Sequence, residues 1–352
     1  GCTMLGQSRY ALSTLLAFGM TGAFLPTAPA HAEPLSFSAD FAVELENDYT
    51  FDADDPAAEL NDFFATIEGA LALEVAPGSG VYATLVLEPI DDPVDDRFLE
   101  DHGLYAEELY VAHDFGAAAV KLGKFNPAFG VAWDAAPGIY GVDFAEDYEL
   151  TERVGLGLDI PLGGAGEHQL SLAAFFADTS FLSDSVIESR GQLDRSDGGA
   201  SNTESPESAS AELSGSLGEA AYNLGLRHQK RGRGDAGDET GVVLGLSRPL
   251  ALGGAEVTVL GELAWFENFD GGPDEAVYGT LGLEADIAGP AVLSAVYAVR
   301  DAENADTDHL ATVTADFELA EGLTLGAGYR YGREGGGDSH TLGALLVYEF
   351  GI

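Results

Sequence analysis

The chain has 352 residues, enough for two or three soluble domains or for one large barrel. Its 60 acidic against 15 basic side chains give a formal charge of -45, and so acidic a surface repels nucleic-acid phosphate, which excludes DNA and RNA binding. The 46% share of hydrophobic residues, with 19 Phe and 13 Tyr, excludes a disordered acidic chain.

The first expected element is a secretory signal peptide over residues 4–32. An apolar stretch follows Arg9, and Ala30-His31-Ala32 has the form of a cleavage site. The stretch is short for a membrane anchor. We therefore expect residues 33–352 to form the working protein. Cys2, the single cysteine, precedes Met4 and is absent from that protein, which excludes disulfides and thiolate chemistry.

From residue 35 onward, apolar and polar side chains alternate with a period of two. Leu35, Phe37 and Ala39 alternate with Ser36 and Ser38, which is typical of a strand with one apolar and one polar face. Segments of about ten residues match strands that cross a bilayer at a tilt. The pattern predicts sixteen strands, near 35–46, 62–75, 80–90, 104–115, 117–125, 148–160, 168–178, 208–217, 220–229, 240–249, 255–266, 275–287, 291–300, 309–319, 323–332 and 339–350.

The connections between these strands alternate between long and short. Short turns follow most even-numbered strands, and long polar loops are expected after the odd ones, at 47–61, 91–103, 126–147, 179–207, 230–239, 267–274, 301–308 and 333–338. This predicts an all-β fold, a 16-stranded antiparallel transmembrane β-barrel with short periplasmic turns and long extracellular loops. A secreted soluble all-β protein is the alternative, but the sequence has no blade-length repeat.

The two faces of such a wall predict opposite tolerances to charge. Leu71 and Leu283 fall on the outward face, where arginine would be costly in lipid. Ala70 and Gly282 fall on the inward face, where we expect arginine to be tolerated better.

Residues 120–130, VKLGKFNPAFG, resemble Gram-negative porins of the phosphate-selective and siderophore-porin-like groups, through the form G-K-F-x-P-x-F-G. Residues 140–153 resemble uncharacterised proteobacterial porin-like proteins. The resemblance covers about thirty residues. It implies an outer-membrane location, a homotrimer, and a third external loop, 126–147, that folds inward and constricts the channel.

The sequence offers little for catalysis or cofactor binding. The histidines of the working protein are scattered, and neither a G-x-S-x-G nor an H-E-x-x-H motif accompanies them. Gly155-Leu-Gly157 and Gly326-Ala-Gly328 lie inside predicted strands, which disfavours a nucleotide loop. Acidic clusters in the loops could gather divalent cations, but a solvated acidic rim is favoured. We predict no catalytic residue, no cofactor and no metal site.

The inward positions supply the candidate pore-lining residues. Basic candidates are Lys121, Arg153, Arg227, Arg300 and Arg330; acidic candidates on the strands are Glu44, Glu68, Glu88, Glu108, Glu262 and Glu284; and those in the third loop or at its end are Asp134, Asp143, Glu146 and Asp147. One hypothesis places a basic wall opposite acidic groups at a narrow waist. The alternative is a wettable lumen whose charges pair locally.

These features predict a porin of the bacterial outer membrane that allows passive diffusion of small hydrophilic solutes. Its partners would be outer-membrane lipid, lipopolysaccharide and the solutes, with no nucleic acid. A substrate-selective uptake porin for phosphate, a siderophore or another solute is the first alternative. A barrel enzyme or an adhesion scaffold is the second.

Overall fold

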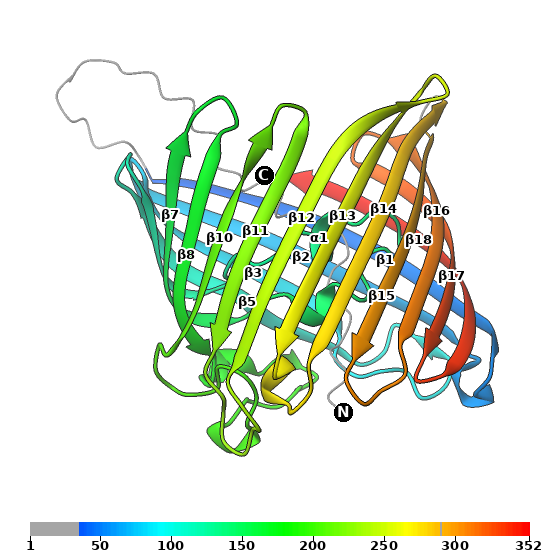
Figure 1. The fold of residues 1–352 in the computed structure, drawn as a ribbon, viewed down its shortest axis with the longest axis horizontal. Coiled ribbons are helices and arrows are strands. Elements are labelled where there is room, and N and C mark those ends of the chain that lie inside the picture. The colour runs from blue at the N-terminus through cyan, green and yellow to red at the C-terminus, as the bar shows by residue number, and fades with distance from the viewer. Residues whose placement is uncertain (1–34, 289–290) are drawn as a thin grey trace.

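The computed structural model describes residues 35–288 and 291–352, so the predicted signal peptide lies outside the described residues. Its strands form one closed cylinder, with long loops at the lower end of Figure 1 and short turns at the upper end. The sheet has eighteen strands, of which β4 (Arg97–Phe98) and β9 (Val186–Ile187) are two-residue strands within loops. The other sixteen form the wall, which confirms the predicted sixteen-stranded antiparallel barrel.

The sixteen strands of the wall follow one another in chain order. They are β1 (Ser36–Ala53), β2 (Asn61–Ala76), β3 (Ser79–Pro89), β5 (His102–Asp114), β6 (Ala119–Phe125), β7 (Arg153–Gly163), β8 (His168–Ala177), β10 (Ser208–Leu217), β11 (Ala220–Gln229), β12 (Glu239–Leu252), β13 (Ala255–Glu267), β14 (Ala276–Ala288), β15 (Ala291–Ala302), β16 (Asp308–Ala320), β17 (Leu323–Glu334) and β18 (Gly337–Gly351). Each pairs antiparallel with its neighbour, and β1 pairs with β18 from Asp40↔Gly351 to Ala53↔Ser339. The barrel therefore has no open sheet edge.

In the part of the chain that the structure describes, helical structure is confined to short segments. They are α1 (Ala132–Ala135), η2 (Pro56–Ala58), η3 (Glu146–Tyr148), η4 (Phe181–Ser183), η5 (Arg195–Asp197) and η6 (Phe269–Gly271). Within the described residues, no helix is both long and apolar enough to cross a membrane.

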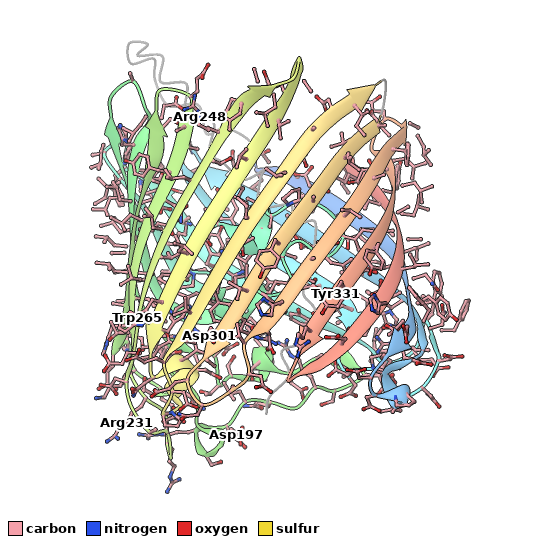
Figure 2. All side chains as sticks on the ribbon, turned by 45° about the vertical axis from the view of Figure 1, so that its right-hand side comes forward. Asp197, Arg231, Arg248, Trp265, Asp301 and Tyr331 are labelled. Carbon is pink, nitrogen blue, oxygen red and sulfur yellow. The ribbon has the colours of Figure 1, made fainter. Side chains whose placement is uncertain are left out.

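The polarity of the wall is inverted relative to a soluble protein. On β11, Leu224 and Leu226 are 44% and 55% exposed on the outer face, whereas Asn223 and Arg227 are buried on the inner face. The same exposed apolar belt includes Leu122 on β6 and Leu263 on β13. Exposed aromatic side chains also occur on the outer face, and Figure 2 places Trp265 toward the long-loop end. A wall that is apolar outside and polar inside is built for lipid around it and water within it.

Several predicted strand boundaries are wrong, and the first, third and last long loops change length as a result. β1 continues to Ala53 instead of residue 46, because Tyr49 and Phe51 carry the outward alternation further, and the first loop shrinks to 54–60. The last loop is a two-residue turn at Gly335 and Gly336, since both glycines adopt positive φ and close a tight hairpin. β7 begins at Arg153 instead of residue 148, so the third loop spans 126–152.

Candidate functional site

The third loop, residues 126–152, lies inside the barrel, where Figure 1 shows α1 within the ring of strands. Glu262 on β13 accepts hydrogen bonds from the backbone N–H groups of Val131, at 2.8 Å, and Ala132, at 3.0 Å. It also accepts one from the Tyr148 hydroxyl at 2.7 Å. Several donors on one buried carboxylate offset the cost of its burial. Glu262 thus fastens both parts of the loop to the wall.

Loop 3 contacts the inner face of nine consecutive strands, β10–β18, which we call the docking wall. One contact from each strand in turn is made by Glu212, Arg227, Val243, Glu262, Tyr278, Arg300, Thr314, Arg330 and Gly343. The loop therefore leaves the larger of the described cavities on the opposite side of the lumen.

Glycines on the docking wall allow the loop to approach closely. A Cβ at Gly282 would lie 2.8 Å from Cδ of Pro137, and one at Gly343 would collide with the Tyr140 hydroxyl. The expectation that Gly282 accepts arginine is therefore wrong, because this inward position faces the loop and not open water. Ala70, by contrast, lines the cavity described below.

Two arginines of the docking wall hold the far end of loop 3. Nη1 of Arg300 lies 2.6 Å from Oδ2 of Asp147, and Nε of Arg330 lies 2.8 Å from Oδ2 of Asp143. Glu334 pairs with both arginines, at 3.2 Å and 2.8 Å. Each of these arginines is therefore matched by at least two carboxylates, and its charge is neutralised where it meets the loop.

Arg227 lies deeper, between loop 3 and the wall. Its Nε lies 2.6 Å from Oε1 of Glu239, and its Nη1 donates to the backbone carbonyl of Tyr148. Its guanidinium also stands 4.6 Å and 4.5 Å from the ring centres of Phe129 and Phe266. Arg227 is 5% exposed, so it stabilises the docked loop by ion-pair, hydrogen-bond and cation–π contacts beside an aromatic cluster.

A cavity of about 960 Å³ separates loop 3 from the inner face of β2, β3 and β5–β8, which we call the open wall. The carboxylates lining it are Glu68, Glu107, Glu108, Asp114, Glu149, Asp159 and Glu167. Among the described side chains around it, Lys121 is the one lysine or arginine, and its Nζ lies 3.1 Å from Oδ2 of Asp159. The lining of the open wall is therefore predominantly acidic.

A β-bulge on β5 places two consecutive carboxylates in this cavity. Thr84 on β3 pairs with Glu108, but Leu85 pairs with Ala106, so Glu107 has no partner on the neighbouring strand. Such an extra residue breaks the alternation of faces. Strict period two would turn Glu107 toward lipid, so sequence reasoning missed it. The adjacent Glu107-Glu108 pair in a predicted strand was the available signal.

The bulged pair is held at the base of loop 3. Asn126 donates through its side-chain amide to Oε1 of Glu107 and through its backbone N–H to Oε1 of Glu108, at 2.5 Å and 3.0 Å. Oε2 of Glu108 accepts a hydrogen bond from the Thr84 hydroxyl at 2.9 Å. These bonds fix both carboxylates beside the cavity that loop 3 leaves.

The remaining predicted residues occupy several environments. Arg153 donates to the backbone carbonyl of Thr151 at the end of loop 3. Glu88 is buried on β3 and accepts a hydrogen bond from the Tyr105 hydroxyl at 2.6 Å, and Glu44 is buried on β1. Asp134 lies in α1, Glu146 begins η3, and Glu284 is exposed near the short-turn end of β14. The structure therefore does not gather the predicted residues into one ring.

Two carboxyls of loop 3 have perturbed acidities. Burial raises the pKa of Asp147, although Arg300 beside it acts in the opposite direction. Burial, followed by the nearby Glu107 carboxylate, holds the pKa of Glu149 well above its usual range. Glu149 therefore takes up a proton at a higher pH than an ordinary glutamate.

The fourth loop, 178–207, also folds toward the lumen, and no sequence signal indicated this. Its Arg190 lies 2.5 Å from Oε1 of Glu152 and 3.8 Å from the ring centre of Tyr105 on β5. Lys124, which is 3% exposed, pairs with both Glu152 and Asp178 at 2.9 Å. Carboxylates in these pairs therefore balance the charges of Lys124 and Arg190 at the root of loop 3.

Comparisons with known proteins define the fold. No family model matches the sequence, and no curated protein matches it. The outer membrane channel DcaP of Acinetobacter baumannii superimposes with a TM-score of 0.62 at 13% identity, over 90% of this chain and 97% of that one. OprB of Pseudomonas putida gives 0.57 at 11% identity, over 90% and 94%. The anion-selective porin from Comamonas acidovorans gives 0.55 at 14% identity, over 90% and 99%. The chain therefore shares the barrel fold of outer-membrane porins and channels.

Proposed function

We propose that the protein is a porin of the bacterial outer membrane that allows small hydrophilic solutes to diffuse passively through a water-filled channel. The observation that carries this proposal is the inverted barrel with loop 3 docked inside it, which leaves a cavity of about 960 Å³, bordered by carboxylates, along the open wall. Similarity of fold to outer-membrane channels supports it.

The outer surface supports placement in a lipid bilayer. Leu224, Leu263 and Leu122 are exposed on the outer face of three separate strands, which would be unfavourable in water. The partners would be outer-membrane lipid and lipopolysaccharide, with the short turns in the periplasm. A homotrimer remains a proposal from the resemblance of residues 120–130, and light scattering of the detergent-solubilised protein tests it.

The cavity lining bears on the narrower proposal of a phosphate or siderophore channel. Phosphate is an anion, and the carboxylates of the open wall, Glu68 and Glu108 among them, repel it. A general porin is therefore the better-supported function, and the phosphate-selective alternative is not.

An enzyme is the other alternative, and its best geometry lies at the short-turn rim. The Ser79 hydroxyl is 2.6 Å from Nδ1 of His113, which resembles a nucleophile with a base. Among residues 35–288 and 291–352, no carboxylate forms an ion pair with His113 to orient it, whereas the ring of Phe115 packs against the imidazole at 4.3 Å. The arrangement favours a structural role for this pair.

Planar-bilayer recording tests the proposed function. Purified protein added to a bilayer should produce stepwise, long-lived current increments in KCl. Liposomes containing the protein should also swell in small sugars but not in large oligosaccharides. Absence of both currents and swelling from protein shown to be inserted would reject the porin proposal.

A further inference from the structure

Charge is distributed unequally across the lumen. On the docking wall, Arg227, Arg300 and Arg330 lie at the interface with loop 3 and are paired with carboxylates there. Lys124, at the root of the loop, is buried against two carboxylates. These positive charges are paired with carboxylates at the loop, so they add little to the electrostatic field along the cavity.

The cavity is bordered by carboxylates from both sides. Glu68, Glu107 and Glu108 project from the open wall, whereas Glu149 projects from loop 3. Glu149 and Glu107 are close enough to influence each other electrostatically. A solute that passes between loop 3 and the open wall therefore meets acidic side chains on both sides.

Aromatic rings line the same cavity. Tyr110 and Phe125 come from the open wall and Trp133 from loop 3. The Lys121 ammonium lies 6.0 Å from the centre of the Tyr110 ring, so a cation already occupies space above this face in the protein itself. Carboxylates beside π faces attract an organic cation by charge and by its apolar body together.

Resting on the proposed porin function, we infer that the channel selects small organic cations, carrying an ammonium or guanidinium group, over anions. Glu107 is the specificity-determining residue, because the β5 bulge brings it into the lumen beside Glu108 and thereby adds a second carboxylate where regular alternation would supply one.

The test compares two double variants that remove the same charge. Glu107→Gln with Glu108→Gln acts in the cavity and keeps a side-chain carbonyl that accepts from Asn126. Glu303→Gln with Glu321→Gln acts at exposed positions beyond the two ends of the wall. Zero-current potentials are measured in a KCl gradient at low mean salt, and liposome swelling is compared for arginine and glutamate as solutes.

The unaltered channel should prefer K⁺ to Cl⁻ and admit arginine faster than glutamate. The cavity variant should lower the K⁺/Cl⁻ permeability ratio by about twofold or more and reduce the arginine advantage, since it removes two adjacent acidic groups that act on a passing ion over a few ångströms. The control variant should change neither. Conducting channels with no cation preference, or with equal effects of the two variants, would overturn this inference while leaving the porin function intact. Absence of current would reject the porin function itself.

Discussion

The two halves of the inner wall differ in what their inward side chains do. The docking wall places glycines such as Gly282 and Gly343 and arginines such as Arg227 against loop 3. The open wall places the carboxylates Glu68 and Glu108 along a cavity. Inward glycines and arginines of the docking wall thus contact the loop, whereas most inward carboxylates of the open wall line the cavity.

The largest expected effect is the difference in stability loss between a substitution of Arg227 and one of Lys121. Arg227→Met leaves Glu239 charged and buried, which should cost about 3 to 5 kcal/mol in the free energy of unfolding. Lys121→Met breaks a partly exposed pair with Asp159 and should cost less than about 1 kcal/mol. Denaturant titration of the protein in lipid vesicles measures both. Equal costs would mean that the two walls do not differ in how they use their cations.

The outer surface should show no such difference between the halves. Leu71→Arg lies behind the open wall and Leu283→Arg behind the docking wall, and each should impair insertion by about 2 to 4 kcal/mol at the bilayer midplane. Folding into vesicles of defined composition measures this. A large cost for only one of the two would show that the other position does not face lipid.

Larger side chains at inward positions should affect stability and conductance differently on the two walls. Gly282→Leu meets Pro137 and should cost about 1 to 3 kcal/mol while displacing loop 3 and disturbing the conductance. Ala70→Leu projects into the cavity, so it should reduce single-channel conductance with little loss of stability. If Gly282→Leu left both stability and conductance unchanged, loop 3 would not rest on the docking wall.

Period-two alternation was enough to predict all sixteen strands of the wall, including the weakly patterned Ser208–Leu217. It also placed the start of loop 3 after Phe125, because the long gap there was visible, but it ended the loop five residues too early. Alternation could not show which way that loop folds against the wall, since the contact between Arg300 and Asp147 joins residues 153 positions apart. It also missed the inward placement of Glu107, because a bulge interrupts the two-residue period on which the prediction relies.

The smallest expected effect is a dependence of the cation preference on pH. It distinguishes the two perturbed carboxyls of loop 3, those of Glu149 and Asp147. The raised pKa of Glu149 means that it binds a proton as pH falls, before ordinary carboxyls do, and each proton bound removes a negative charge from the cavity. Cation preference should therefore be full above this raised pKa and begin to fall while most carboxyls are still ionised. Asp147 pairs with Arg300 behind the loop, so its titration should alter selectivity little.

Zero-current potentials recorded in steps from pH 8 to pH 4 test this, with Glu149→Gln as the comparison. The variant should lower the preference at high pH and remove the early part of the decline, and an unchanged pH profile would place Glu149 outside the conducting path.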